Sequence, residues 1–331
     1  MALLTIQTPG ATVRLQSDRL LVTLPDASGP PEPVHLLELE RVVLHPGVQV
    51  STPALCELLR RQVPVTFVSG HGRVLGSFEP PQPPRGSSRL LQYQRTSDPA
   101  AALTLARQLV QAKIANGHRL LQRLDANHHR LESAPISALA SRERAAGLAP
   151  DLPSLLGEEG AAAATFFDAW ARFLPAEFPF GERSTRPPKN PVNACLSYVG
   201  ALVYGELLTA CVVRGLDPAL GCLHQSQDDR WSLPLDLMEP FRPALIEPLT
   251  LRLFSHRILQ SRHFEPHENG VWLSGEGRRE LLSHYDHRVQ REFYSETVGH
   301  RTTLRQQLQN AAVRFKLALT QPESLAPFRL N

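Results

Sequence analysis

The pattern of hydrophobic and polar positions changes near residue 85. Up to that point, apolar and polar residues alternate in short runs divided by turn-forming residues, which is typical of β-strands. The alternation predicts strands over residues 3–25, with a tight turn at 16–18, and over 34–44, 63–69 and 74–78. Ser51 and Pro53 predict the start of one short helix that runs to Arg61. Residues 1–85 are therefore predicted to form a small, β-rich N-terminal domain.

Beyond residue 85, apolar residues recur three and four positions apart, as on one face of an α-helix. The clearest stripe consists of Leu103, Ala106, Val110, Ile114, Gly117 and Leu121. The same period predicts helices over 136–147, 156–174, 191–214, 244–257, 276–293 and 302–319, with a small hairpin over 264–273. Residues 86–331 are therefore predicted to form a larger all-α C-terminal domain, which makes the fold class α+β.

A proline-rich polar stretch, residues 80–88, predicts a linker between the two domains. Three other features predict a cytoplasmic protein that lies outside the membrane. The nearly all-apolar helix over 191–214 contains Glu206, and the cost of a carboxylate in lipid favours a buried core helix over a membrane span. The first ten residues lack the basic region and long apolar core of a signal peptide, and the four cysteines show no CxxC spacing. We expect a cytoplasmic protein with reduced thiols.

The charged residues are unusual in kind more than in number. The net charge is only +3, but the chain has 32 arginines and three lysines, Lys113, Lys189 and Lys316. Arginine suits phosphate recognition, although the same bias can reflect genome composition. The net charge is −1 up to residue 80 and +4 beyond it, so an anionic partner is expected to meet the second domain.

Residues 221–243 carry the most suggestive chemistry. His224 precedes a polar loop, and Asp236 and Glu239 follow it three residues apart in an otherwise apolar run. On a regular helix these two carboxylates would share a face, and with the imidazole they resemble a nitrogen and oxygen site for a divalent metal. The alternative is a solvated helix face beside an ordinary loop histidine. Pro240 predicts a kink or a helix boundary directly beside the carboxylates.

A third acid falls on an apolar stripe. In the helix predicted over 156–174, Glu159 aligns with Ala163, Phe166 and Trp170, so it is predicted to face inward, whereas Glu158 does not. An inward acid must be paired, metal-bound or near a water-filled cleft. The alternative is that both glutamates merely favour the positive end of the helix dipole. Arg301, Arg305 and Arg314 are predicted to share a partly exposed face, either solvated or in contact with phosphates.

Several of these stretches also occur, in the same order, in a known family. They are GVQVS at 47–51, VTFVS at 65–69, GEEGA at 157–161, RPP at 186–188, PVNACLSY at 191–198, LDLME at 235–239, FRP at 241–243, EGRR at 276–279 and PFR at 327–329. In these motifs the chain resembles CRISPR-associated protein one, the integrase of spacer acquisition, over nearly its whole length. That family has a β-rich N-terminal domain, used for dimerisation, and an all-helical catalytic domain.

The resemblance implies a set of site residues. The metal ligands and catalytic residues would be Glu159, His224 and Asp236, with Glu239 as an accessory ligand, and the metal would be Mn²⁺ or Mg²⁺. Asn190, Gln225 and Pro240 depart from the family pattern without removing a primary ligand. Arg242, Arg301 and Arg305 are expected to contact DNA phosphates.

The resemblance also implies an activity and partners. The enzyme would join the 3′-hydroxyl of a short prespacer duplex to a phosphodiester at the edge of a CRISPR repeat. It would act as a homodimer together with CRISPR-associated protein two. Two alternatives remain open: a non-catalytic DNA-binding scaffold of the same complex, and a general metal-dependent nuclease in which water replaces the 3′-hydroxyl.

Overall fold

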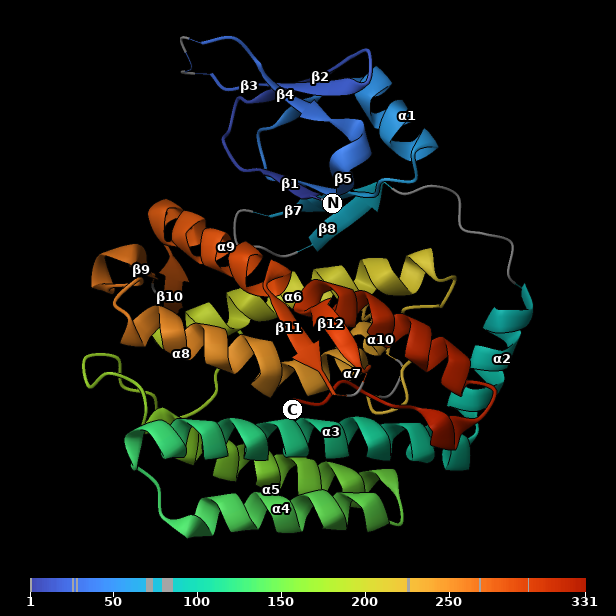
Figure 1. The fold of residues 1–331 in the computed structure, drawn as a ribbon, viewed down its shortest axis with the longest axis vertical. Helices are drawn as coiled ribbons and strands as arrows, with labels where there is room; N and C mark the ends of the chain where they lie inside the picture. Colours follow the sequence, from blue (N-terminus) through green and yellow to red (C-terminus); the bar gives the residue numbers. More distant parts are fainter. Residues whose placement is uncertain are drawn as a thin grey trace. The chain divides into compact units, whose positions relative to one another are not determined.

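The computed structural model describes residues 2–331 except 26, 28, 70–73, 79–85, 225–226, 268 and 297. The chain divides into two compact units, residues 1–83 and 84–331, whose elements are labelled in Figure 1. The division lies close to the boundary predicted after residue 85. The predicted turn at 70–72 and most of the predicted linker fall outside the described residues.

The described residues of the first unit form two four-stranded sheets and one α-helix. One sheet has the order β1 (Ala2–Ile6), β5 (Leu39–Leu44), β7 (Val65–Val68), β8 (Val74–Phe78), and the other has the order β4 (Glu32–His35), β3 (Arg19–Thr23), β2 (Thr12–Gln16), β6 (Gln49–Val50). The first three strands of the first sheet are parallel. The helix is α1 (Thr52–Arg60), as Ser51 and Pro53 predict. Val13, Leu20 and Leu58 are almost fully buried in the core of this unit.

The strand predicted over 34–44 is wrong in one respect, because it is two strands that belong to different sheets. A short 3-10 helix, η1 (Leu36–Glu38), separates β4 from β5 and buries Leu36. The apolar alternation shifts phase here, because Leu36 and Leu37 are adjacent, and this local shift marks the change of sheet that the prediction of one strand overlooked. The tight turn at 16–18 is confirmed: Gln16 pairs with Arg19, and Ser17 has a φ of 52°.

The second unit is mostly helical and has one core. Its helices are α2 (Gly86–Ser97), α3 (Pro99–His128), α4 (Ser133–Leu148), α5 (Leu152–Ala171), α6 (Pro191–Val213), α7 (Ser232–Met238), α8 (Glu247–Ser255), α9 (Gly275–Gln290) and α10 (Leu304–Ala318). Two hairpins accompany them, β9 (Phe264–His267) with β10 (Gly270–Leu273) and β11 (Glu292–Ser295) with β12 (His300–Thr303). The short turns are η2 (Glu239–Phe241), the π-helix η3 (Arg242–Ile246), η4 (Ser261–His263) and η5 (Pro322–Ser324). The α+β fold class is thus confirmed.

Two details of the predicted helices are wrong. Helix α2 begins at Gly86, inside the predicted linker, and the ends of the helices predicted over 276–293 and 302–319 form the hairpin of β11 and β12. Thr303 explains the second error: its hydroxyl accepts from the Gln306 N–H at 3.2 Å, and the Gln306 side chain accepts from the Thr303 N–H at 3.1 Å. This capping box fixes the start of α10 at Leu304, two residues after the predicted start, and leaves the preceding residues extended.

Helix α6 lies in the core of this unit, as predicted from the carboxylate of Glu206 within it. Among the described residues it is the one helix long and apolar enough to cross a membrane, and 44% of its most apolar window is buried within the fold. It packs against α7, α8 and α10. Asn190, one of the departures from the family pattern, caps it: its side chain accepts from the Asn193 N–H at 2.8 Å.

Helices α3, α4 and α5 lie side by side and form one layer (Figure 1). The segment from α7 to α8 packs on α3 from the other side, through η2 and η3. This segment is not one helix, because Pro240 and Pro243 each remove a backbone donor and divide it into 3-10 and π turns. The helix boundary predicted beside Pro240 is therefore confirmed, since α7 ends at Met238.

Candidate functional site

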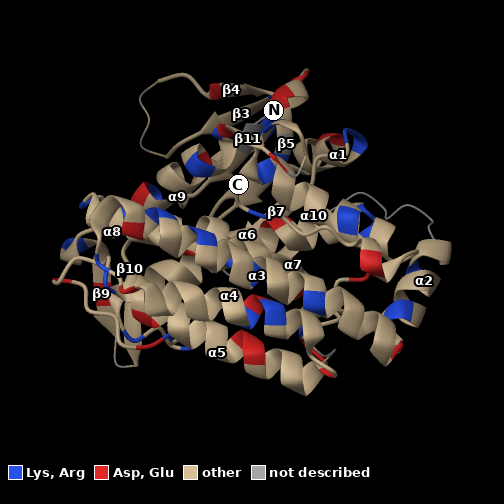
Figure 2. Cartoon of the chain, turned by 60° about the horizontal axis from the view of Figure 1, so that its bottom comes forward, with Lys and Arg blue, Asp and Glu red and all other residues tan. Residues whose placement is uncertain are grey.

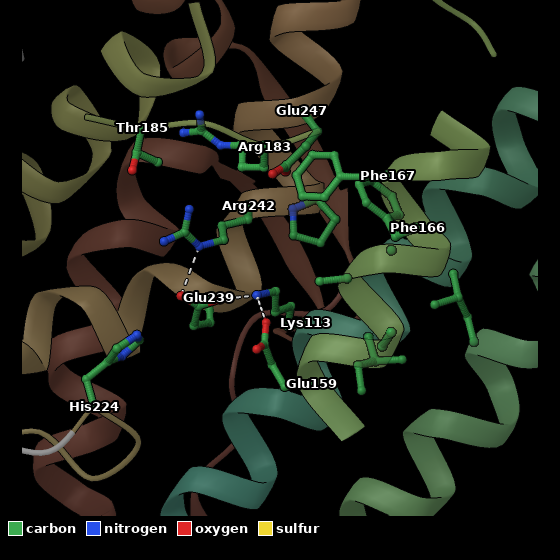
Figure 3. A pocket seen from close by; sticks show the side chains of 16 residues that line it. Lys113, Glu159, Phe166, Phe167, Arg183, Thr185, His224, Glu239, Arg242 and Glu247 are labelled. Carbon is green, nitrogen blue, oxygen red and sulfur yellow. Dashed lines mark hydrogen bonds and ion pairs between the residues drawn. The ribbon is translucent and has the colours of Figure 1, made fainter. Parts of the chain in front are cut away.

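A cavity of about 310 Å³ lies between the layer of α3, α4 and α5 and the segment that begins at η2 (Figure 3). One part of its wall is apolar and comes mainly from α3 and α5, including Phe166 and Phe167. The other part is charged. The charged and imidazole side chains that line it are Lys113, Glu159, Arg183, His224, Glu239, Arg242 and Glu247.

Lys113 occupies the middle of the charged part. It projects from the apolar stripe of α3, and its ammonium forms ion pairs with Glu159 Oε1 and, at 2.5 Å, with Glu239 Oε2. Burial lowers the pKa of Lys113, but Glu239 and Glu159 more than compensate, so the pKa is raised overall and the amine is charged. Two carboxylates from distant parts of the chain therefore converge on one cationic nitrogen.

Glu239 has a second cationic partner. The Arg242 Nε donates to Glu239 Oε1 at 2.9 Å, one turn further along the chain. Burial raises the pKa of Glu239, but Arg242 and Lys113 lower it more, to about 2, so this carboxylate is ionised at neutral pH although its side chain is only 4% exposed. Burial likewise lowers the pKa of Arg242, but the carboxylates of Glu239 and Glu247 raise it by more, so the net shift is upward.

Asp236 has a different environment. It is fully buried, and its carboxylate accepts from the backbone N–H groups of Cys222, Leu223 and His224 at 2.5, 2.9 and 2.9 Å. It also contacts the His224 Nδ1 at 2.7 Å. Gly221 is required beside it, because a Cβ there would lie 2.6 Å from Asp236 Oδ2 and 2.9 Å from the His224 carbonyl oxygen.

Asp236 thereby determines which nitrogen His224 presents. A carboxylate can only accept a hydrogen bond, so the His224 Nδ1 carries the proton of this contact. The other ring nitrogen, Nε2, is then the one left for a ligand in the cavity, which the imidazole lines. Burial lowers the pKa of His224, but Asp236 and Glu239 raise it more, and the net shift is upward. Asp236 itself does not line the cavity.

Three of the four predicted site residues lie on one cavity, and Asp236 lies behind one of them, His224. The structure brings Glu159 and Glu239 together at Lys113 and places His224 on the same cavity, as Figure 3 shows. The backbone stays helical from Asp236 to Glu239, but the two carboxylates have different partners: Asp236 binds residues 222–224, whereas Glu239 faces Lys113 and Arg242. Within the part of the chain that the structure describes, no three His, Cys, Asp or Glu side chains are grouped closely enough to hold a metal ion. The metal ligands therefore stay a prediction, with Glu239 rather than Asp236 facing the cavity.

Sequence reasoning missed three charged residues of this cavity. Besides Lys113, these are Arg183, which donates to Asn193 Oδ1 at 2.9 Å and to Ser197 Oγ at 3.2 Å, and Glu247. Burial raises the pKa of Glu247 to about 7, while burial and Arg242 lower the pKa of Arg183 to about 10. One signal was available: a lysine stands in an apolar stripe of a chain that otherwise uses arginine almost throughout.

Asn116 connects this site to the end of the chain. One turn after Lys113 on α3, its amide nitrogen donates to the carbonyls of Pro240 and Phe328 at 2.8 and 2.9 Å. Its amide oxygen accepts from the Leu330 N–H at 2.8 Å. Phe328 also stacks on Phe241, with ring centroids 5.3 Å apart. The backbone next to Glu239 is thus held by α3 and by residues 328–330 together.

The predicted DNA-contacting arginines occupy unlike positions. Arg242 lines the cavity, and Arg301 is 70% exposed in β12, where it pairs with Glu292 at 3.1 Å. The exposed position predicted for Arg305 is wrong: it is buried because it neutralises Asp286 and Glu206, at 2.9 and 3.6 Å. Figure 2 shows basic and acidic positions interspersed over the helices, so in that view the charges do not separate by sign.

Comparisons with known proteins agree with this architecture. The family model described as CRISPR associated protein Cas1 matches residues 4–287. The CRISPR-associated endonuclease Cas1 1 of Thermus thermophilus is 36% identical over 326 residues, which is 97% of each chain.

Two solved structures are also similar. One chain of a Cas6-RT-Cas1–Cas2 complex is 25% identical with a TM-score of 0.81, and the match covers all of this chain and 36% of that longer one. A casposase bound to an integration product gives a TM-score of 0.84 at 19% identity, covering 100% of this chain and 96% of that chain, a likeness that shows the fold alone.

Proposed function

The chain belongs to the CRISPR-associated protein Cas1 family, and from this premise we propose that it is a DNA endonuclease and integrase of CRISPR adaptation. It joins the 3′-hydroxyl of a short DNA duplex to a phosphodiester of a CRISPR repeat. The observation that carries the proposal is the convergence of Glu159 and Glu239 on one cationic position in a cavity that His224, Arg183 and Arg242 also line.

We propose further that the site takes Mn²⁺ or Mg²⁺, held by Glu159, His224 and Glu239. The donor types suit these ions: two carboxylates already face one positive charge, and the His224 imidazole lines the same cavity. Because the structure describes all three side chains and does not group them closely enough to hold an ion, binding has to draw them together. A buried carboxylate on the other ring nitrogen is the usual support of a metal-binding histidine, so Asp236 would orient His224 and not ligate. When bound, the metal supplies a Lewis acid that polarises a phosphoryl oxygen.

The remaining residues of the cavity handle the charge of the DNA. Arg242 and Arg183 are half-buried cations whose guanidinium groups suit phosphate oxygens, and partial burial makes their attraction stronger than at the surface. They favour a phosphodiester in the cavity and stabilise the negative charge that develops during transfer. Asp236 holds residues 222–224 and thereby keeps the imidazole at a fixed position.

The proposed partners are double-stranded DNA, a second copy of the chain and CRISPR-associated protein two. The proposal of a Cas2 partner is supported by the name of the similar Cas6-RT-Cas1–Cas2 complex, and that of DNA by the casposase bound to an integration product. The homodimer, with residues 1–85 as its dimerisation domain, is proposed from the family resemblance.

The test is a strand-transfer assay with a labelled prespacer duplex and a repeat-containing plasmid, with Mn²⁺ or Mg²⁺ and with EDTA. We expect joined products only with metal, and a loss of about 100-fold or more in Glu159→Gln, His224→Ala and Glu239→Gln with duplex binding retained. Glu158→Gln is the matched control, because Glu158 pairs with Arg142 at 2.9 Å and does not line the cavity.

Three results would contradict the proposal or redirect it. Equal joining by Glu239→Gln and the parent would exclude the metal site. Hydrolysed products without joined ones would favour a general metal-dependent nuclease. Binding of duplex with no metal-dependent reaction would leave a DNA-binding scaffold.

A further inference from the structure

The ammonium of Lys113 lies where the proposed metal would have to bind. It contacts one oxygen of Glu159 and one oxygen of Glu239, the two carboxylates proposed as ligands, and its side chain is only 17% exposed (Figure 3). A metal ion held by the same two oxygens would share the space and the counter-charge that Lys113 now uses. The lysine and the metal therefore compete for the same partners.

The charges of this cluster are already balanced. Glu159 and Glu239 contribute two negative charges, and Lys113 and Arg242 contribute two positive ones. A divalent ion added without any rearrangement would leave a buried excess of positive charge, which is strongly unfavourable in a site with little water. Withdrawal of one of the two cations relieves this excess, as does ionisation of Glu247, which lines the same cavity with a pKa raised by burial to about 7. Of the two cations, Lys113 is the one that touches both carboxylates.

We propose that Lys113 is a built-in competitor for the metal, which holds the two carboxylates together before metal binds and withdraws from between them when it does. This inference rests on the proposed function, because it takes Glu159 and Glu239 as ligands. Lys113 would then be a positioning residue that sets the metal affinity of the site and keeps the acids from repelling each other in the metal-free protein.

A lysine is the side chain suited to this role. Its ammonium is a compact charge on a flexible four-carbon stem, whereas the guanidinium of arginine is planar and binds carboxylates in a fixed geometry. The cavity next to Lys113, of about 310 Å³, gives the stem room to turn without a change in α3. The chain uses lysine at only three positions, and this is the one among the acids of the cavity.

The first experiment is isothermal titration of Mn²⁺ into the full-length parent, Lys113→Met and Lys316→Met without DNA. We expect Lys113→Met to bind Mn²⁺ at least about tenfold more tightly than the parent, because the competing charge is gone. Lys316→Met removes a half-buried lysine whose ammonium donates to the Arg214 carbonyl at 2.7 Å, so it should leave the affinity unchanged. Removal of a purely structural lysine would not tighten metal binding. Equal or weaker binding by Lys113→Met would therefore overturn the inference.

The second experiment needs no variant to fold. With ¹⁵N-lysine labelling only three ammonium signals are expected, and that of Lys113 should persist because its side chain is only 17% exposed and is ion-paired. Mg²⁺ should shift or broaden this signal and leave those of Lys189 and Lys316 in place. A Lys113 signal that does not respond to saturating Mg²⁺ would overturn the inference.

The proposed metal centre and the proposed role of Lys113 can be disproved separately. If Mn²⁺ binds the parent and Glu239→Gln equally, the metal centre of the proposed function is wrong, and the inference falls with it. If Glu239→Gln loses the site but Lys113→Met binds as the parent does, only the inference is wrong.

Discussion

Asp236 and Glu239 lie three residues apart and are both buried, but the protein stabilises their charges in different ways. Asp236 accepts from three backbone N–H groups and contacts the His224 ring, all within residues 222–224. Glu239 faces two side-chain cations, Lys113 and Arg242. Backbone donors are fixed by the fold, whereas a side-chain cation can turn away. The first acid therefore maintains the architecture, and the second can exchange partners.

The largest effect should follow from the removal of Asp236. Asp236→Ala leaves three buried N–H groups and an imidazole without their acceptor, which we expect to cost about 3–5 kcal/mol in the free energy of unfolding. Strand transfer should be lost as well, because His224 loses its orientation. Urea unfolding followed by circular dichroism measures the first effect. A variant as stable as the parent would show that Asp236 does not hold residues 222–224.

Glu239→Gln should have a smaller effect on stability, and one that depends on pH. Folding lowers the pKa of Glu239 from its ordinary value of 4.5 to about 2, so its charge stabilises the native state above pH 4.5 and this contribution is lost as the pH falls toward 2. We expect the variant to be about 3 kcal/mol less stable at pH 7. The difference from the parent should shrink between pH 4.5 and pH 2 in urea titrations.

A difference that stays constant over this pH range would contradict the account of Glu239. It would mean that the side chain contributes through packing and not through its charge. Lys316→Met provides a control for pH effects from elsewhere in the second unit, because Lys316 does not line the cavity.

Asn116→Ala tests whether the backbone around Glu239 is held independently of residues 222–224. The substitution breaks hydrogen bonds to Pro240, Phe328 and Leu330, so we expect a loss of about 2 kcal/mol in the free energy of unfolding. Strand transfer should fall while duplex binding is retained. Thermal unfolding and the transfer assay measure the two effects, and unchanged transfer would show that this support is dispensable for Glu239.

The smallest effect is expected at Glu158, the neighbour of Glu159 in α5. Its pair with Arg142 is partly exposed, and such pairs contribute little, so Glu158→Gln should change stability by less than about 1 kcal/mol and leave strand transfer intact. Glu159→Gln in the same assays should lose transfer. If the two variants behave alike, the distinction between an inward and an outward acid in this helix is wrong.

Much of the fold could be predicted from local patterns, and the failures share a cause. The strands of the first unit and the long helices of the second follow from periodicity, since one face of each is buried. The corner at Leu36 and the hairpin before α10 do not, because each is decided by only two or three residues: the alternation shifts phase at Leu36 and Leu37, and hydrogen bonds between Thr303 and Gln306 set the start of α10.

The candidate site could be predicted only where a residue acts within its own helix. Glu159 faces inward because its position on the stripe of α5 requires it. The roles of Asp236 and Glu239 could not be separated, because their partners, residues 222–224 for Asp236 and Lys113 for Glu239, lie elsewhere in the chain and the spacing of the two acids does not reveal them. Lys113 could not be placed either, since its two partners lie 46 and 126 positions away along the chain.

The bridge made by Asn116 couples the backbone beside Glu239 to residues that follow much later in the chain. The carbonyls of Pro240 and Phe328 accept from the same amide nitrogen, and the Leu330 N–H donates to the oxygen of that amide. A change in the position of residues 328–330 is therefore transmitted to the backbone next to Glu239, although these residues do not line the cavity.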